Sequence, residues 1–340
     1  MIISSEFVPA VGLKGPNAQT ILASLIPRKH QIRASRRERL IMPDNDFVDF
    51  DWFDNTVSSP IVIILYGMTG SIDGYYVQDI LKEIKANGWR AILLYYRGCS
   101  GEPNLIDRSY HLSDTLGLDT LVKELRRREP NTPITAVGYS MGANILLKWL
   151  GEVGAAADLT TAVAVSTPFD LRMASNRLRQ GFSSFYQWWL IGDLHDYVRS
   201  KYQNRKPPFD FGDVTQLKSF WEFDDAITAP LNGFKDAADY YGRSSCRPSL
   251  KNITVPTLAL HARDDPFMMP ATIPSEAELS PTTTIELSEH GGHVGFISGN
   301  LFLGKLEFWL PIRITRHLQA CLQPVVEPIT ITAEPAVNHA

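Results

Sequence analysis

The sequence feature that most constrains the fold is the stretch 134–150, which reads ITAVGYSMGANILLKWL. Apolar, β-prone residues precede its glycine-serine-glycine pattern and an amphipathic helical pattern follows, which predicts a strand, an abrupt turn and a helix. A serine on such a strained corner brings backbone segments very close together, so residues without a Cβ fit best at Gly138 and Gly142. We therefore expect Ser140 to present its hydroxyl at the end of a sheet, beside the Met141 amide. A tight turn with an incidental serine is the alternative interpretation.

Composition indicates an ordinary globular protein and excludes several classes of function. The 340 residues are 44% hydrophobic and 21% charged, which fits one large α/β domain with an insertion. The net charge is -4, so the chain has no excess of basic residues, and we expect no nucleic-acid partner. The chain lacks both a signal-peptide pattern and any run approaching the roughly 18 apolar residues of a membrane span, so we expect a cytoplasmic protein without one.

The cysteines indicate a reducing compartment. They are three in number, widely spaced and without a C-x-x-C pair (Cys99, Cys246, Cys321). We therefore expect neither a disulfide framework nor a structural zinc site. No motif implies a metal or an organic cofactor, so we expect none.

Patterns typical of buried strands and of helices alternate along the chain. Apolar runs of strand length occur at 60–66, 89–96, 134–137, 161–166, 256–261 and 283–287, with helical patterns at 76–86 and 114–128. This alternation predicts right-handed βαβ units in a mostly parallel central sheet with helices on both faces. Before the first of these runs we expect two antiparallel strands joined by a turn at 44–46.

The other segments suggest the domain organisation. Residues 168–250 carry many aromatic residues and no convincing buried strand, so we interpret them as a helical cap over the strand ends. The N-terminal residues predict an irregular arm with one or two helical turns, and a last helix over 306–322 is expected to break or restart at Pro311. The predicted parts are an arm (1–35), a core in two parts (36–167 and 251–322), the cap (168–250) and a disordered tail (323–340).

Candidate partners for Ser140 follow it in the chain. A serine hydroxyl needs a base to take its proton, and that base needs an anion to fix its tautomer. In the α/β-hydrolase arrangement the acid and then the histidine come after the serine. Here Asp264 and Asp265 follow one predicted strand, and His290 and His293 follow the next.

Two local patterns rank these candidates. The strand-His-Gly-x-x-Asp pattern favours Asp265 as the acid, because His261 and Ala262 take the places of His and Gly, and leaves Asp264 as a loop carboxylate. His293 is favoured as the base because the Gly-Gly pair before it lets its loop approach the serine. A simple turn and a structural histidine are the alternative interpretations of the two motifs.

A second backbone donor for a developing oxyanion is expected in the loop after the first central strand. Tyr66-Gly67-Met68 occupies that place, so the Met68 amide would join the Met141 amide. Many hydrolases have His-Gly here, whereas this chain has Tyr66. A backbone donor survives that change, because the amide and not the side chain acts.

Together these motifs resemble the YheT-like branch of the α/β-hydrolase superfamily, which includes bacterial hydrolases and yeast medium-chain ethyl ester synthase/esterases. The similarity covers nearly all of residues 7–320. Its most specific marks are 97–101 (RGCSG), 138–144 (GYSMGAN), 222–225 (EFDD) with 240–241 (YY), 264–267 (DDPF) and 290–296 (HGGHVGF). The resemblance implies an α/β-hydrolase fold with Ser140, Asp265 and His293 as a catalytic triad.

Two further groups of residues have both a structural and a functional interpretation. For Arg97, Glu222, Asp224 and Asp225 we favour ion pairs that tie the cap to the core over contact with a substrate. For the aromatic stretch 182–191 we favour the core of the cap. The alternative for that stretch is an acyl-chain pocket or a surface that meets lipid.

The expected function is hydrolysis of carboxylic esters with a short or medium acyl chain, through an acyl-enzyme on Ser140. The expected partner is a small-molecule acyl ester, with transient lipid contact. An acyltransferase that passes the same acyl group to an alcohol or thiol is the alternative. A non-catalytic binding scaffold is a weaker one, because such a chain would be expected to have lost a member of the triad.

Overall fold

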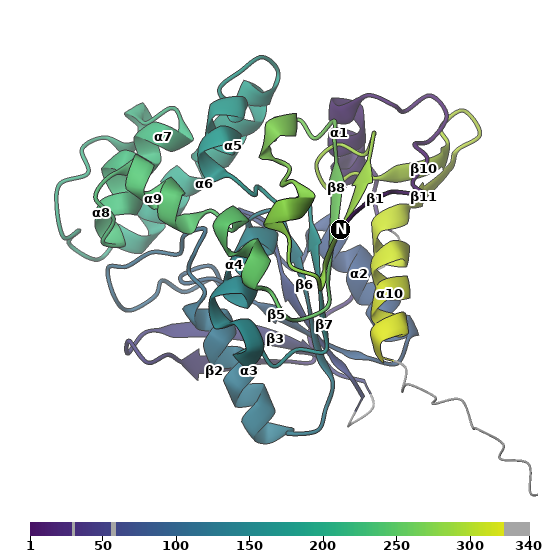
Figure 1. Ribbon diagram of the computed structural model, residues 1–340. Coiled ribbons are helices and arrows are strands. Elements are labelled where there is room, and N and C mark those ends of the chain that lie inside the picture. Colours follow the sequence, from purple (N-terminus) through teal and green to yellow (C-terminus); the bar gives the residue numbers. More distant parts are fainter. Residues whose placement is uncertain (29–30, 56–58, 323–340) are drawn as a thin grey trace, which may run out of the picture.

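The computed structural model describes residues 1–28, 31–55 and 59–322, and the predicted tail 323–340 lies outside them. Within these residues, nine strands form one sheet in the order β1-β9-β8-β7-β6-β4-β5-β3-β2 (Figure 1). The first seven strands in this order pair in parallel, and β3 and β2 join antiparallel at one edge. The predicted, mostly parallel sheet is therefore confirmed. The strands are β1 (Ile2–Ser4), β2 (Arg36–Ile41), β3 (Phe47–Phe53), β4 (Ile61–Leu65), β5 (Arg90–Leu94), β6 (Ile134–Tyr139), β7 (Thr161–Val165), β8 (Thr257–Ala262) and β9 (Thr283–Ser288).

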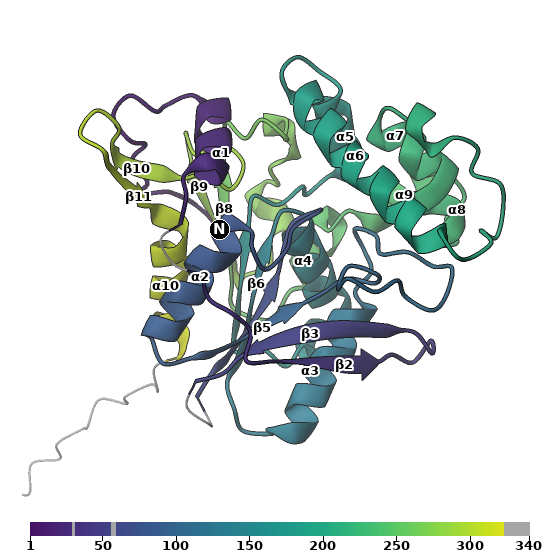
Figure 2. The same cartoon turned by 180° about the vertical axis from the view of Figure 1, so that it is seen from behind.

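Helices cover both faces of the sheet, as Figures 1 and 2 show from opposite sides. On one face α2 (Tyr75–Ala86) packs beside α10 (Trp309–Leu322), and on the other α3 (Leu116–Arg128) lies next to α4 (Met141–Val153). Every residue of β4, β5, β6 and β7 is buried. A strand covered on both faces buries nearly all of its side chains, which is why these strands are mostly apolar runs in the sequence, interrupted only by polar residues such as Arg90, Thr135 and Thr161.

The antiparallel edge formed by β2 and β3 is fixed by paired charges. Arg37 stands opposite Asp51, and Arg39 stands opposite Asp49. The guanidinium groups bind the two carboxylates at N–O distances of 2.7 and 2.8 Å. Opposite charges directly across a ladder stabilise that register, because a slip by one residue would separate both pairs.

Both ends of the described chain differ from the sequence-based expectation. Residues 2–4 form β1 at the edge of the sheet beside β9, and α1 (Pro16–Leu25) is a ten-residue helix, so the arm is more regular than predicted. Near the other end a hairpin of β10 (Ile297–Asn300) and β11 (Lys305–Phe308) precedes α10. Pro311 lies in the first turn of α10, where proline needs no broken hydrogen bond, so the predicted break there is wrong.

A group of helices lies beyond the carboxyl ends of the central strands (Figure 1). It follows β7 and precedes β8 in the chain. Its helices are α5 (Leu171–Leu178), α6 (Ser183–Tyr202), α7 (Phe220–Phe223), α8 (Ala229–Leu231) and α9 (Ala237–Ser244). Because the residues at these strand ends lie beneath the group, any ligand that reaches them must contact its helices.

Candidate active site

The predicted strand, turn and helix around Ser140 are confirmed. Strand β6 ends at Tyr139, α4 begins at Met141, and Ser140 between them has φ 51° and ψ -115°. A Cβ on Gly138 would lie 2.6 Å from the carbonyl oxygen of Gly142, and a Cβ on Gly142 only 2.3 Å from that of Leu65. Both glycines are therefore required because backbone segments approach closely here. The strained corner holds Ser140 at the carboxyl end of β6.

The structure brings the three predicted polar residues together. His293 Nε2 lies 2.9 Å from Ser140 Oγ, and His293 Nδ1 lies 2.8 Å from Asp265 Oδ2. An ionised carboxylate only accepts hydrogen bonds, so Nδ1 donates to Asp265 and Nε2 is left to accept from the serine hydroxyl. Asp265 follows β8 and His293 follows β9, and these strands are parallel neighbours whose carboxyl ends meet.

The competing candidates form a second pair beside the first. His290 Nδ1 lies 3.3 Å from Asp264 Oδ2, and Asp264 Oδ1 accepts a hydrogen bond from the Gly292 amide at 3.0 Å. His290 is 40% exposed, whereas the Asp265 side chain is completely buried. Asp264 thus fastens the loop that carries His293, and His290 does not contact Ser140.

Several groups that the sequence reasoning missed fix the imidazole. The Phe267 ring stacks on His293 with the ring centres 3.9 Å apart and the planes within 3°. The Phe267 amide donates to Asp265 Oδ1 at 2.8 Å, and the His293 amide donates to the Thr20 hydroxyl of α1 at 2.9 Å. Both oxygens of the Asp265 carboxylate are therefore engaged, and the base has one orientation.

His261, which guided the choice of acid, has no role in this chain of hydrogen bonds. Neither of its ring nitrogens has a hydrogen-bond partner within the described residues. Its complete burial lowers the pKa of His261 to about 4, so its ring is neutral near pH 7. It packs against Phe169, with the ring centres 5.5 Å apart, and acts as an apolar support beneath the site.

The two predicted amide donors flank Ser140. Met68 lies in the loop between β4 and α2, and both it and Met141 line the cavity next to Ser140. Within the part of the chain that the structure describes, no acceptor is hydrogen-bonded to either amide. The Met68 loop is fixed by the Gly67 amide, which donates to the Tyr76 hydroxyl at 2.9 Å. Two free N–H groups at this corner can stabilise a negative oxygen.

A large cavity opens from Ser140 between α1 and α6 and has a volume of about 600 Å³. Its wall is rich in aromatic side chains, including Tyr75, Phe182, Phe185, Tyr186, Trp189 and Phe267. We call this cavity the large arm. Its size lies within the range of about 300–1,000 Å³ that is typical of small-molecule sites.

A second cavity extends from Ser140 under the cap and measures about 70 Å³. Its wall is formed mainly by Pro168, Leu171, Ala174, Leu178, Phe220 and Met268. We call it the small arm. The two arms meet at Met68, Ser140 and Leu190, which line both.

The interpretation of the stretch 182–191 as the core of the cap is wrong for most of its aromatic residues. Phe182, Phe185, Trp188 and Trp189 are all exposed, Trp188 to 69%. Three of the four line the large arm, and Trp188 lies outside it. Their apolar character reflects a cavity mouth and not a packed interior.

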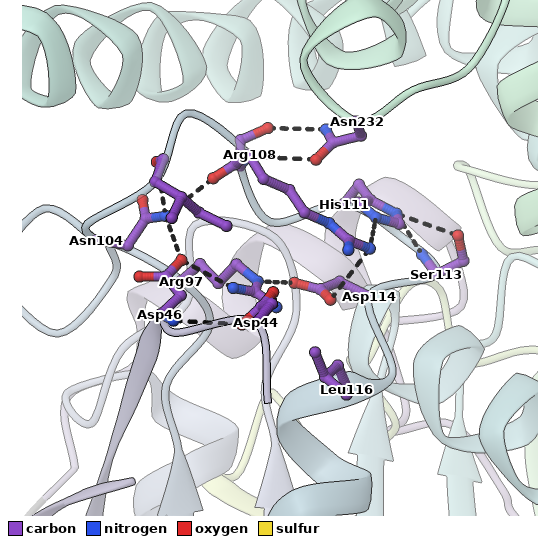
Figure 3. Close-up of polar contacts among 12 residues, drawn as sticks. Asp44, Asp46, Arg97, Asn104, Arg108, His111, Ser113, Asp114, Leu116 and Asn232 are labelled. Carbon is purple, nitrogen blue, oxygen red and sulfur yellow. Dashed lines mark hydrogen bonds and ion pairs between the residues drawn. The ribbon is translucent and has the colours of Figure 1, made fainter. Parts of the chain in front are cut away.

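Arg97 does not pair with the cap, which corrects a second expectation. Its guanidinium binds three carboxylates of the core, Asp44, Asp46 and Asp114, each at 2.8 Å (Figure 3). Arg97 is 1% exposed, so it does not face a substrate. The cap contacts this region through the Tyr197 hydroxyl, which donates to the Arg97 carbonyl oxygen at 3.2 Å.

The three acids expected to face Arg97 act within the cap. Glu222 caps the start of α7, and Asp225 accepts from the Ala237 amide at 2.9 Å. Asp224 is buried and accepts from the Tyr241 hydroxyl at 2.7 Å. Burial raises the pKa of Asp224 to about 7, and Asp224 lines the small arm.

The described residues contain neither a metal-binding cluster nor a membrane-spanning helix. No group of three or more His, Cys, Asp or Glu side chains among residues 1–28, 31–55 and 59–322 could hold a metal ion. None of the helices in the same ranges combines the length and the apolar character needed to cross a membrane.

The nucleophile corner on a mostly parallel sheet and the cap above it define the α/β-hydrolase class. A model of the α/β hydrolase fold matches residues 60–300, and the chain belongs to this family. Within the family it is YheT-like. It is 36% identical to YheT of Escherichia coli (strain K12), a provisionally assigned esterase, over 94% of this chain and 95% of that protein.

More distant relatives fit the same family. Human phospholipase ABHD3 is 29% identical over 88% of this chain and 75% of its own length. Among solved structures, the esterase Pf2001 of Pyrococcus furiosus superposes with a TM-score of 0.55 at 16% identity, covering 94% of this chain and 98% of that one. At that identity the likeness supports the fold alone.

Proposed function

We propose that this protein is a serine hydrolase that cleaves carboxylic esters with a short or medium acyl chain. The observation that carries the proposal is the continuous chain of hydrogen bonds from Ser140 through His293 to Asp265, with contacts of 2.9 and 2.8 Å. The names of two relatives, an esterase and a phospholipase, both describe cleavage of esters and support the proposal.

The proposed mechanism assigns one role to each group. Ser140 Oγ attacks the ester carbon while His293 Nε2 takes its proton, and Asp265 stabilises the imidazolium that forms. The Met68 and Met141 amides donate to the oxyanion of the tetrahedral intermediate. His293 then gives the proton to the leaving alcohol, and the same base activates a water that releases the acid from Ser140.

An acyltransferase is the second candidate, and the large arm is the observation that favours it. A cavity of about 600 Å³ beside His293 can hold an alcohol or a thiol where water would otherwise attack. Adding ethanol to an ester assay tests this reaction. Ester exchange faster than acid release would favour the transferase, and acid release unaffected by ethanol would exclude it for that acceptor.

We also propose transient contact of the cavity mouth with lipid. The exposed side chains of Phe182, Phe185 and Trp188 lie near the mouth, and Leu25 lines it from α1 with 66% exposure. Because this apolar rim continues into the cavity that reaches Ser140, an apolar substrate could enter directly from an aggregate. Trp188→Ala should weaken binding to phosphatidylcholine vesicles more than Ile41→Ala, a change of an exposed residue on β2. Equal binding of both variants would contradict the proposal.

The cysteines bear on the proposed cytoplasmic location. Cys99, Cys246 and Cys321 are all free thiols. Unpaired thiols are typical of a reducing compartment, which supports that location. Fractionation of cells that express the full chain tests it, and recovery of the protein outside the cytoplasm would contradict it.

The central experiment compares Ser140→Ala with Ser24→Ala on a series of p-nitrophenyl esters. Ser24 lines the same large arm, so its substitution makes the same chemical change in the same cavity without touching the proposed nucleophile. We expect Ser140→Ala to abolish turnover and Ser24→Ala to retain it. A fluorophosphonate probe should label the wild type at Ser140 alone. Turnover that survives Ser140→Ala would refute the proposed nucleophile.

A further inference from the structure

The two arms that meet at Ser140 are chemically different. His293 lines only the large arm, and Met141 lines only the small arm. Leu190 and the side chain of Met68 stand where they join. His293, the proposed proton acceptor, therefore borders one cavity, and Met141, whose amide is a proposed oxyanion donor, borders the other.

This asymmetry decides which part of an ester occupies which arm. In the tetrahedral intermediate the carbon carries the serine oxygen, the oxyanion, the alcohol oxygen and the acyl chain. The bond from carbon to the alcohol oxygen breaks as that oxygen receives the proton from His293 Nε2, so the alcohol must lie on the His293 side. The acyl chain takes the remaining direction, away from His293 and past Met141.

We propose that the protein selects esters of short acids with large apolar alcohols, the small arm holding the acyl group and the large arm holding the alcohol. This inference rests on the esterase function proposed above and names its substrate class. The aromatic stretch 182–191 then binds the alcohol side of the substrate and not the acyl chain.

The sizes of the arms support this selection. A cavity of about 150 Å³ can hold benzene, so the small arm of about 70 Å³ holds about three carbon atoms. Its wall includes Leu112 and Asp224, whose carboxyl accepts a hydrogen bond from Tyr241 at 2.7 Å. A longer apolar chain would have to lie against this buried polar pair or displace it, which costs free energy. The large arm has no such limit.

A pair of isomeric esters tests the assignment on the unmodified protein. Octyl acetate and ethyl octanoate have the same atoms and similar hydrophobicity, but the long chain is on the alcohol in the first and on the acid in the second. We expect kcat/KM, measured by titration of the released acid, to be at least about tenfold higher for octyl acetate. Equal rates or a preference for ethyl octanoate would overturn the assignment, even though Ser140-dependent turnover would preserve the esterase proposal.

If neither isomer is hydrolysed, the assay is repeated with p-nitrophenyl acetate. If that ester is hydrolysed by the wild type and not by Ser140→Ala, the esterase proposal stands and the assignment of the arms is wrong. If p-nitrophenyl acetate is not hydrolysed either, the esterase proposal itself fails. The two failures are therefore distinguishable.

Two substitutions provide a matched test within the cavity. Ala174 lines only the small arm and Trp189 only the large arm. Ala174→Leu should lower the ratio of butyrate to acetate hydrolysis by about tenfold with the alcohol held constant. Trp189→Ala should instead reduce the preference for octyl over ethyl acetate and leave the dependence on acyl length unchanged. The inference would be overturned if Ala174→Leu changed the dependence on alcohol length and Trp189→Ala changed the dependence on acyl length.

Discussion

Asp264 and Asp265 are adjacent carboxylates, and changing each to asparagine tests which of them serves the base. Asp265 Oδ2 accepts a hydrogen bond from His293 Nδ1 at 2.8 Å, and its side chain is fully buried. In Asp265→Asn the imidazole changes to the tautomer with its proton on Nε2, because the amide nitrogen then donates to Nδ1. Nε2 no longer accepts the serine proton. The same change in other serine hydrolases lowers kcat by about 10⁴-fold, or about 5 kcal/mol.

Asp264→Asn should have a much smaller effect. Its Oδ1 accepts from the Gly292 amide, and the amide oxygen of asparagine can keep that hydrogen bond. The substitution removes only the negative charge beside the partly exposed His290, whose Nδ1 lies 3.3 Å from Asp264 Oδ2. Exposed ion pairs contribute up to about 1 kcal/mol to the free energy of unfolding. We therefore expect Asp264→Asn to lower kcat by less than about tenfold.

The assay is turnover of p-nitrophenyl acetate by both variants, with thermal melting of each protein as the control for folding. Both variants should melt within a few degrees of the wild type. If Asp264→Asn loses more activity than Asp265→Asn while both stay folded, the acid is Asp264 and the geometric reasoning is refuted.

Three further predictions concern stability. Gly142→Ala should lower the free energy of unfolding by at least about 3 kcal/mol, because its Cβ would lie 2.3 Å from the carbonyl oxygen of Leu65. Gly192→Ala, where a Cβ meets nothing within 4 Å, should raise it by about 0.5–1 kcal/mol, and equal urea midpoints for the two variants would contradict this reasoning. The pKa of Asp224 is raised to about 7, so the folded state keeps a proton that the unfolded state releases near pH 4. The free energy of unfolding of the wild type should therefore fall by up to about 4 kcal/mol as the pH rises from about 4 to about 7. Asp224→Asn should lack this loss, and a constant difference between the two proteins from about pH 4 to about pH 8 would refute it. Arg97→Met leaves buried carboxylates without their cation and should cost about 3–5 kcal/mol in urea unfolding, and a variant as stable as the wild type would show that the cluster is dispensable.

Most of the fold could be predicted from the sequence because the central strands are buried on both faces. Runs such as 60–66 and 161–166 are almost entirely apolar, and that pattern is typical of a parallel sheet covered by helices. β1 has only three residues, too few to show any periodicity. The β10–β11 hairpin was missed because its strands have four residues each, too few to distinguish a strand period from a helix period. Short elements of this kind are fixed by their partners in space.

The residues that hold the site together were less predictable than the three residues of the proposed triad. Each residue of the proposed triad belongs to a local motif at the end of a strand, namely Ser140, Asp265 and His293. Local motifs can be recognised in a single sequence. Thr20, which accepts from the His293 amide, lies 273 residues away and belongs to no such motif. Phe267 is different, since it ends the DDPF motif two residues after Asp265, and that position could have indicated it.

Two of the wrong interpretations, those of the stretch 182–191 and of Arg97, have a common physical cause. Apolar composition indicates removal from water but does not distinguish a packed core from the wall of a cavity, so the stretch 182–191 was assigned to the interior. In the same way, a charged residue such as Arg97 predicts that partners exist without saying which they are. Asp44, Asp46 and Asp114 reach it from segments far apart in the chain, which only the fold brings together.

The replacement of histidine by Tyr66 beside the proposed oxyanion donors is compensated by other tyrosines. The Tyr96 hydroxyl donates to the Tyr66 carbonyl oxygen at 2.7 Å, and the Tyr66 hydroxyl accepts from the Tyr96 amide at 3.3 Å. Burial raises the pKa of Tyr96 well above its usual value, so this hydroxyl keeps the proton it donates. The Tyr76 hydroxyl holds the next amide, that of Gly67. Because none of these phenols titrates near neutral pH, they fix the loop without a histidine and leave the Met68 amide free for its proposed role as an oxyanion donor.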